Sequence, residues 1–201
     1  MTNTASQQRR RMTPVREAEI YEVVLGLLKD VGYEALTMDE IAAHTGCSKA
    51  TLYRWWSGKA ELVIRALRHE SPDDTVLANT GSLRGDLLAL VTREDDHVLE
   101  RRSALLRSMA MAVYHNPALL EGVRDHLVRP HAAALRCLIQ QAIDRGEVAS
   151  DCPALPFVTE MVLGAVIART LIDDQPPTRA FLSAYVEAVI IPALGVSAAH
   201  T

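Results

Sequence analysis

Aromatic residues are scarce in this chain: Phe, Tyr and Trp together make up 4% of its 201 residues. Ala and Leu dominate instead, and β-branched residues occur only in short runs. Strands favour β-branched and aromatic side chains, whereas Ala and Leu are strong helix formers. The composition therefore predicts an all-α fold of about nine to ten helices.

Cysteine is equally scarce. Cys47, Cys137 and Cys152 are odd in number and far apart, with no CxxC motif and no Cys/His cluster at zinc spacing. We therefore expect reduced cysteines and a cytoplasmic location. The N-terminus lacks the apolar segment of a signal peptide, and no apolar run reaches the roughly 18 residues of a membrane span. The sequence predicts no membrane partner.

Signatures of catalysis are missing as well. No nucleophile elbow, Walker-type loop, dinucleotide-binding glycine motif or HExxH helix occurs. The adjacent residues 95–97 cannot all point at one ion from a helix, and His126 and His131 lack a third ligand. We predict no enzyme activity, no metal and no cofactor. A helical enzyme or ligand carrier remains a rival hypothesis, and loss of turnover on mutating a carboxylate or His would support it.

Charge of one sign does not dominate the chain, whose net charge is −4. Residues 1–68 nevertheless contain ten Lys and Arg against eight Asp and Glu, so this part is slightly basic and the remainder is acidic. A basic head on an acidic body suits a protein that presents one end to phosphate.

The N-terminal segment carries its own signals. Residues 1–12 are polar and include Arg9–Arg11, so we predict a disordered basic arm. This arm is either a solvated tail or a segment that reaches phosphate or a minor groove. Thr13 is expected to cap a first amphipathic helix with Pro14 at its first position, and Gly32 is expected to end it.

The stretch from Thr37 to Trp56 predicts two short helices joined by a tight turn. Thr37 and Glu40 have the spacing of a capping box, which begins the first of these helices. Gly46 permits the positive φ of a tight turn, and Ser48 is a good N-cap for the second helix. In that second helix, Leu52 and Trp56 are expected to face inward. The outward or sideways positions are Lys49, Ala50, Thr51, Tyr53, Arg54 and Trp55.

This stretch, TMDEIAAHTGCSKATLYRWWSGKAEL, resembles the N-terminal domain of the TetR family of bacterial transcriptional regulators. The resemblance covers about residues 14–66 and implies a helix-turn-helix whose second helix enters the major groove of DNA. It departs from the family at Cys47, where Val is usual. We expect Cys47 to pack as a small apolar residue, with a redox role as the alternative.

The resemblance also implies roles for single residues. Thr37 and Ser48 would cap helices whose N-termini point at phosphate. Arg54 would contact guanine, and Ala50 or the Thr51 methyl group would meet a thymine methyl. The residues implied at the DNA surface are Thr37, Ser48, Lys49, Ala50, Thr51, Tyr53, Arg54, Trp55 and Lys59. Among these, Tyr53 and Lys59 would hold phosphates, and Trp55 would lie near the backbone.

A second domain is predicted after the polar break that begins at Ser71. We assign residues 13–70 to DNA binding and residues 71–201 to effector binding and dimerisation. The pattern of residues 71–201 also resembles, more loosely, the C-terminal part of a TetR subgroup. Pro117 and Pro130 are each expected to begin a helix. Where many relatives carry aromatic residues after Gly164, this chain has small aliphatic ones, so a pocket would differ in size and chemistry.

Two clusters in this second domain are candidate sites. An adaptable ligand pocket, with core packing as the alternative, would be lined by Met109, Val113, Tyr114, Phe157 and Met161. The last two helices are apolar around much of their girth and therefore need two packing partners, one of which would be a second copy of the chain. The expected dimer residues are Gly164, Ala165, Ala168, Phe181, Tyr185 and Val189.

The sequence therefore predicts a homodimeric transcriptional regulator that binds a palindromic double-stranded DNA operator. Repression, with release by an unidentified small-molecule effector, is the role that the resemblance implies. A sequence-tolerant architectural DNA-binding protein that uses Arg9–Arg11 is the alternative, and a specificity ratio near one would favour it. The acidic body counts against this alternative.

Overall fold

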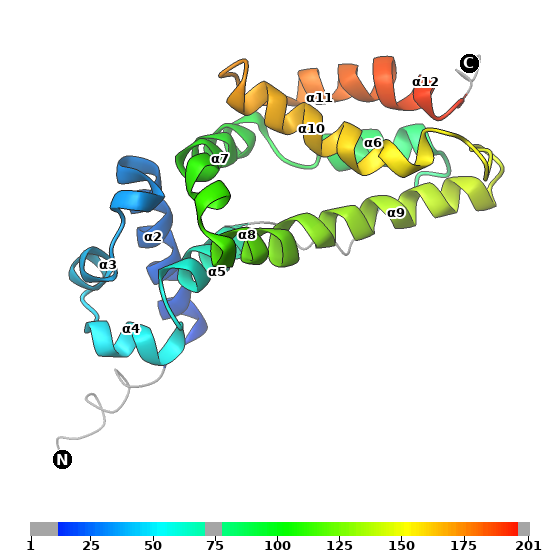
Figure 1. Cartoon of the computed structure of the whole chain (residues 1–201). Coiled ribbons are helices and arrows are strands. Elements are labelled where there is room, and N and C mark those ends of the chain that lie inside the picture. Colours follow the sequence, from blue (N-terminus) through cyan, green and yellow to red (C-terminus); the bar gives the residue numbers. More distant parts are fainter. Residues whose placement is uncertain (1–11, 71–77, 197–201) are drawn as a thin grey trace. The chain divides into compact units, whose positions relative to one another are not determined.

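The computed structural model describes residues 12–70 and 78–196, and this part of the chain is helical without a strand (Figure 1). The α-helices are α2 (Pro14–Ala35), α3 (Met38–Thr45), α4 (Lys49–Trp55), α5 (Lys59–Glu70), α6 (Leu83–Thr92), α7 (Asp96–His115), α8 (Pro117–Val123), α9 (Arg129–Asp144), α10 (Val158–Leu171), α11 (Arg179–Tyr185) and α12 (Ile191–Ala193). A π-helix, Arg124–Val128, joins α8 to α9, and another, Val186–Ile190, joins α11 to α12. The all-α prediction is confirmed. The expected basic arm, 1–12, lies almost wholly outside the described residues.

The expected helix ends appear where local chemistry places them. Thr13 caps α2 through a bond from the Arg16 amide, and Gly32, at φ 77°, interrupts the helix near its end. Thr37 and Glu40 form both bonds of the capping box of α3. Short-range signals therefore predicted these boundaries correctly, because capping depends on residues within one turn of each other.

The expected start near Pro130 is confirmed, because α9 begins at Arg129 and Pro130 lies in its first turn. The sequence did not show that α9 follows α8 and the π-helix without a break, so that helical backbone runs from Pro117 to Asp144. Pro130 lies at the start of α9, directly after the π-helix. A π-turn widens the backbone and leaves some amides without their usual partner, so a proline, which has no amide hydrogen, is accommodated there.

The described residues fall into two compact units. Unit 1 comprises residues 12–70 and 111–126, and unit 2 comprises residues 78–110 and 127–196. Residues 111–126 belong to the second domain by sequence, yet they pack with the predicted DNA-binding residues. Chain order alone does not reveal this, because the sequence signals only one boundary, near residue 71.

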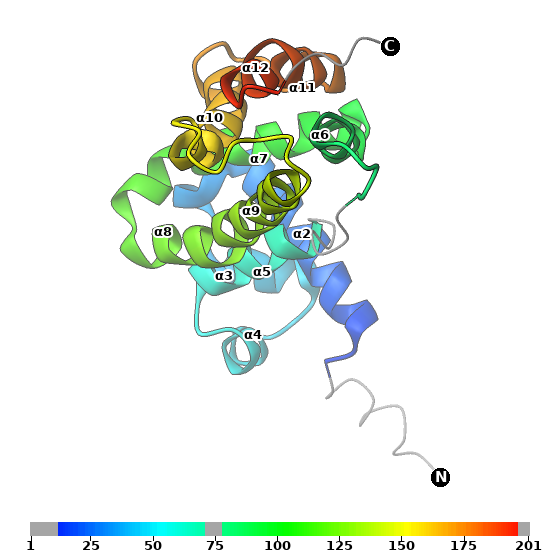
Figure 2. The same ribbon diagram turned by 90° about the vertical axis from the view of Figure 1, so that its right-hand side faces the viewer.

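Unit 1 is built around the pairing of α2 with α5. Ile20, Val24 and Leu28 lie on one stripe of α2 and are fully buried, and Leu62 and Val63 of α5 are equally buried. Burial of this stripe holds α2 against α5, while α3 packs on α2 and α4 packs on α3. In Figures 1 and 2, α4 lies at one end of unit 1.

Residues 111–126 join unit 1 through α8, which packs on α5. Leu119 of α8 is fully buried. A Cβ atom added to Gly122 would lie 2.8 Å from Cγ1 of Ile64, so glycine permits the close approach of the two helices. Asn116 caps α8 with its side-chain oxygen, and its amide nitrogen lies 3.5 Å from the Tyr33 hydroxyl.

Unit 2 has its own apolar core, which joins α6, α9, α10 and the α11–α12 segment. Leu83, Leu138 and Ile190 are among its fully buried side chains. The Asp86 side chain is fully buried but accepts hydrogen bonds from Thr80 and pairs with Arg145, so its charge is compensated.

Candidate nucleic-acid interface

The turn between α3 and α4 has the geometry that the sequence predicts. Gly46 adopts the left-handed conformation at φ 64°, which a side chain would strain, and its amide bonds back to Ala42. Ser48 then caps α4 by accepting a hydrogen bond from the Thr51 amide at 3.1 Å. These two residues set the angle between the helices.

Two inward residues anchor α4 to unit 1. Leu52 is fully buried, and Trp56, the residue after the helix, is 4% exposed. The Trp56 indole meets the Tyr21 ring edge-on, with ring centroids 5.9 Å apart. Burial of Leu52 and Trp56 confirms their predicted core positions and fixes which face of α4 turns outward.

Arg16 adds a restraint that the sequence did not reveal. Its guanidinium donates to the carbonyl oxygen of Thr45 and lies 3.6 Å from Sγ of Cys47, while its other nitrogen pairs with Glu19. The Arg16 pKa is raised, first by the bond to Glu19 and then by Cys47. This side chain therefore ties α2 to the interhelical turn. No local pattern signals a contact between residues about thirty positions apart.

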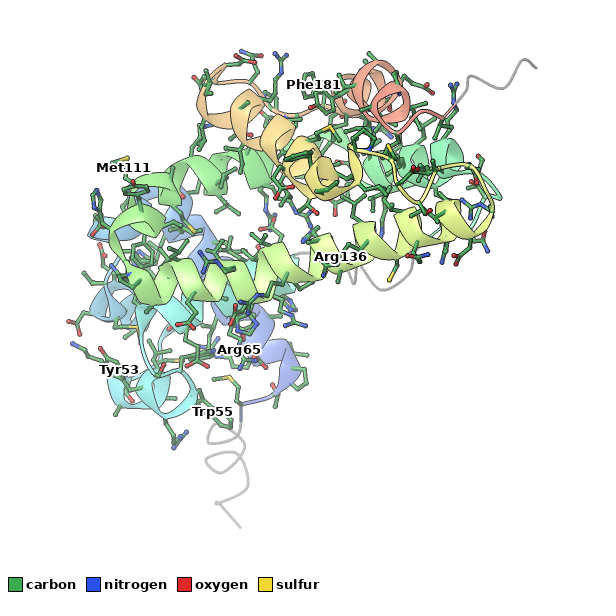
Figure 3. The ribbon with its side chains drawn as sticks, turned by 45° about the vertical axis from the view of Figure 1, so that its right-hand side comes forward. Tyr53, Trp55, Arg65, Met111, Arg136 and Phe181 are labelled. Atoms are coloured by element: carbon green, nitrogen blue, oxygen red, sulfur yellow. The ribbon has the colours of Figure 1, made fainter. Side chains whose placement is uncertain are left out.

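The outward face of α4 is exposed, polar and partly aromatic. Lys49, Ala50 and Arg54 are exposed, and Tyr53 and Trp55 are 47% and 45% exposed. Figure 3 labels Tyr53 and Trp55 on this helix. The Arg54 guanidinium carbon lies 5.8 Å from the centre of the Trp55 ring. Exposed aromatic and cationic side chains on an anchored helix form a surface that can meet base edges and phosphates.

The capping hydroxyls already have partners within the protein. Oγ of Ser48 and Oγ1 of Thr51 lie 2.8 Å apart. The Thr37 hydroxyl accepts from the Glu40 amide, and the Thr37 amide donates to the Glu40 carboxylate. A phosphate contact by Thr37 therefore competes with a carboxylate that occupies the same helix end, and this contact stays a prediction.

Lys49 has a carboxylate partner. Its Nζ lies 2.9 Å from Oδ2 of Asp39, across the interhelical turn. The hydrogen bond to Asp39 raises the pKa of Lys49 above its ordinary value. Sequence reasoning missed Asp39, because nothing in the spacing of ten residues shows that α3 and α4 bring the two side chains together.

Lys59 also has protein partners. Its ammonium donates to the carbonyl oxygens of Tyr33 and Leu36 at 2.7 and 2.8 Å. Burial lowers the pKa of Lys59 below its ordinary value. An ammonium group has three hydrogens, so one remains for the expected phosphate contact. Its first role in this structure is to satisfy carbonyl groups at the end of α2.

The five expected pocket residues are divided between the two units. Met109 is buried in unit 2, and Met161 packs beside the core of that unit. Val113 and Tyr114 belong to unit 1, and Tyr114 is 84% exposed. Phe157 is 60% exposed. A role of Tyr114 and Phe157 in an adaptable pocket therefore stays a prediction, and in the described chain both side chains are exposed.

The expected dimer residues divide into two groups. Ala165 is buried inside unit 2, so little of its side chain is available to a second copy of the chain. Phe181 and Tyr185 are half-buried, with their rings 6.1 Å apart, and Arg169 lies over the Phe181 ring. Gly164 and Val189 are exposed, and Ala168 is intermediate. The exposed positions of α10 and the α11–α12 segment also include Ile167, Leu171, Ala180, Ala184 and Ala188.

Other site classes receive no support from the described residues. They contain no group of three or more His, Cys, Asp or Glu side chains placed to hold a metal ion. None of the helices in residues 12–70 and 78–196 combines the length and apolarity that crossing a bilayer requires. Cys47, Cys137 and Cys152 are free thiols.

An anchored, exposed α4 preceded by α3 and a glycine turn defines the helix-turn-helix class of DNA-binding proteins. Residues 20–66 match the family model described as bacterial regulatory proteins, tetR family. Residues 77–189 match a second model, a tetracyclin repressor-like C-terminal domain. The chain belongs to the TetR family of helix-turn-helix transcriptional regulators.

Individual relatives agree with this assignment. An uncharacterized HTH-type transcriptional regulator of Mycobacterium tuberculosis is 37% identical over 182 residues, which cover 89% of this chain and 88% of the relative. A DNA-binding transcriptional repressor TetR of Mycobacteroides abscessus is 30% identical over 88% of this chain and 92% of that protein. The crystal structure of the TetR family transcription regulator SCO0332 is similar with a TM-score of 0.67 and 28% identity, covering 90% of this chain and 98% of that one.

Proposed function

We propose that this regulator is a repressor that binds a palindromic operator as a homodimer and is released by a small-molecule effector. The observation that carries the proposal is that α4 has a buried side and an exposed side. Leu52, and Trp56 directly after the helix, are buried. Lys49, Tyr53 and Arg54 are exposed. A helix held in this way can enter a major groove without losing its packing.

The exposed residues of α4 divide by chemistry. The Arg54 guanidinium is suited to bidentate contact with guanine, and the Ala50 methyl group to contact with a thymine methyl. The Tyr53 hydroxyl can donate a hydrogen bond to a phosphate oxygen, and Trp55 would lie beside the sugar-phosphate backbone of the DNA. Lys49, at the first position of α4, would reach base edges, because the N-terminal residues of a recognition helix are the ones that enter deepest.

A second copy of the chain would cover the exposed small and apolar positions of α10 and the α11–α12 segment. Ala180, Ala184 and Ala188 recur every four residues and are all exposed, as are Ile167 and Leu171 of α10. Small side chains at this spacing allow two helices to approach closely. Pairing through this face would give a dimer with two helix-turn-helix elements, one from each chain. Such a dimer would bind a palindromic site with half-sites about 34 Å apart or somewhat more.

Effector release is proposed from family membership and from chain connectivity. An effector bound to unit 2 would favour one of two conformations, with a coupling free energy of about 1–3 kcal/mol. Residues 111–126 leave unit 2 at the end of α7, pack within unit 1 and return to unit 2 at α9. This segment, together with α5, provides a covalent route for the coupling.

The decisive experiment is selection of bound duplexes from a random pool by the full-length protein. We expect a palindromic consensus, which would support base reading and pairing together. A pool that returns no preferred sequence would overturn the proposal in favour of a sequence-tolerant architectural protein. A consensus with a single half-site would support base reading and reject the homodimer.

A further inference from the structure

The contact between Asp39 and Lys49 joins the two helices of the helix-turn-helix at the surface expected to meet DNA. Oδ2 of Asp39 lies 2.9 Å from Nζ of Lys49, and the side chains are 73% and 49% exposed. Ion pairs this exposed contribute little to folding, because water screens them. The pair therefore has no evident task in stability, although it involves a residue of the reading helix.

The carboxylate of Asp39 lies close to the N-terminus of α3 and to a second carboxylate, that of Glu40. Asp39 lies in the first turn of α3, where the helix dipole stabilises a carboxylate. Glu40, the next residue, is engaged in the capping box with Thr37. The first helix of a helix-turn-helix crosses the DNA backbone. A phosphate approaching this end of α3 therefore meets two carboxylates.

The contact with Asp39 restricts where the ammonium group of Lys49 can lie. A lysine side chain has a flexible four-carbon stem and a compact charge, and it binds phosphates without regard to sequence. A carboxylate in contact with its ammonium restricts this freedom. The restriction holds the ammonium at the first turn of α3, 2.9 Å from the Asp39 carboxylate.

We propose that Asp39 is a specificity-determining residue that tethers the ammonium of Lys49 to α3 and thereby keeps it from phosphates in non-specific complexes. The inference rests on the proposed reading role of α4. Specificity is a difference between two affinities, and Asp39 raises it by weakening the competing, sequence-independent complex. A residue with this role makes its contribution without touching a base.

The test measures binding of the full chain to a duplex selected from the random pool and to a scrambled duplex of equal length, over a range of salt concentrations. For Asp39→Asn we expect affinity for the scrambled duplex to rise about three- to tenfold. Its log–log salt slope should steepen by about 0.9, the value for one added phosphate contact. Affinity for the selected duplex should change by less than about twofold, so the specificity ratio falls.

Three further variants separate the tether from a general charge effect. Asp30→Asn makes the same change in net charge on an exposed part of α2, and it should leave the salt slope unchanged. Asp39→Glu keeps the charge and should retain most of the specificity ratio. Lys49→Gln removes the tethered group, so adding Asp39→Asn to it should not steepen the slope further. Thermal unfolding by circular dichroism checks that each variant is folded.

The outcomes discriminate clearly. An unchanged slope in Asp39→Asn, or an equal steepening in the Lys49→Gln background, would overturn the tether, because the effect would be absent or independent of Lys49. Failure of the proposed function has another signature: the wild-type protein would show no preference for any duplex in the pool. The slope on scrambled DNA remains measurable in that case and decides the tether separately.

Discussion

The Lys59 ammonium donates a hydrogen bond of 2.7 Å to the carbonyl oxygen of Tyr33 and lies 4.3 Å from the centre of the Tyr33 ring. A second bond, to the Leu36 carbonyl oxygen, completes the arrangement. One side chain at the start of α5 thus holds the end of α2 and the approach to α3. Lys59 therefore contributes to the shape of the head as well as to its charge.

Replacing Lys59 by Met is expected to lower the free energy of unfolding by about 2 kcal/mol. The variant leaves two carbonyl groups without their charged donor, and such bonds are worth more than neutral ones. Urea denaturation measures this loss. The expected phosphate contact would separately reduce the salt slope of DNA binding by about 0.9. A destabilised variant with an unchanged slope would assign Lys59 to structure alone.

Arg54→Ala is expected to relax sequence preference without affecting the fold. The variant removes a bidentate donor, which is worth about 1–3 kcal/mol of discrimination at one base pair. Binding to the selected duplex and to single-base variants of it measures the change. Arg65→Ala, which removes the same charge from an exposed position on α5, is the control and should keep full discrimination. Equal behaviour of the two variants would contradict the assignment of α4 as the reading helix.

The elements that sequence reasoning placed correctly depend on neighbours within one or two turns. The capping box of α3, the left-handed Gly46 and the buried Leu52 and Trp56 all follow from local spacing. They were predictable because caps, turns and amphipathic stripes are short-range properties. The candidate reading surface was therefore outlined from the sequence alone.

The features that sequence reasoning missed join residues that are distant in the chain. Examples are the contact of Arg16 with the interhelical turn and the pairing of Asp39 with Lys49. The packing of residues 111–126 into unit 1 is another. Such contacts depend on how helices pack, and one sequence carries no periodic signal for them. Tyr114 shows a related limit of local patterns. It lies at helical spacing among apolar residues, yet its side chain is exposed, because spacing alone does not show whether another helix packs on that face.

Glu61 is expected to make the stability of unit 1 sensitive to acid. Its carboxylate accepts hydrogen bonds from the Ser57 amide and hydroxyl at 2.8 and 2.7 Å. The bond from the backbone amide is the main cause that lowers the pKa of Glu61 below its ordinary value of 4.5. The folded state thus holds the proton less tightly than the unfolded state, and the stabilisation is present above pH 4.5 and lost as pH falls through the lowered pKa.

The measurement compares wild type with Glu61→Gln by urea denaturation between neutral and acid pH. Near neutrality the variant should be less stable by about 1 kcal/mol, as for loss of a comparable cap. The difference should shrink as pH falls below the ordinary value and Glu61 becomes protonated. Glu121→Gln, an exposed change on α8, should show no such pH-dependent difference. If the difference in free energy of unfolding between wild type and Glu61→Gln stayed constant with pH, ionisation of Glu61 would not be the source of the stabilisation.

Ala184→Arg is expected to separate the proposed dimer. Ala184 is exposed on α11, so the variant chain can fold, but a charged side chain on a face that must be buried is costly. Light scattering after gel filtration should show half the wild-type mass. Operator affinity should fall by a factor of about ten or more, because the second head no longer binds at high effective concentration. Ala133→Arg, on an exposed position of α9, should remain dimeric. A dimeric Ala184→Arg with full affinity would place the interface elsewhere.

Gly122→Ala tests the packing of α8 on α5. A Cβ atom at this position would lie 2.8 Å from Cγ1 of Ile64, and overpacking costs about 1–3 kcal/mol. Alanine also gains helix propensity, by about 1 kcal/mol at most. We therefore expect a lower Tm for Gly122→Ala. Gly26→Ala in α2 should raise Tm, because nothing lies within 4 Å of its added Cβ.

A double-mutant cycle with Ile64→Ala isolates the steric cause. Removing the Ile64 side chain beyond Cβ eliminates the atom that the new methyl group would meet. Gly122→Ala should then become neutral or stabilising in that background, although Ile64→Ala alone costs about 2–5 kcal/mol. The same loss from Gly122→Ala in both backgrounds would show that contact with Ile64 does not set the cost. Because α8 packs on α5, which directly follows the reading helix, operator affinity measured on the same variants would show whether this contact also positions α4.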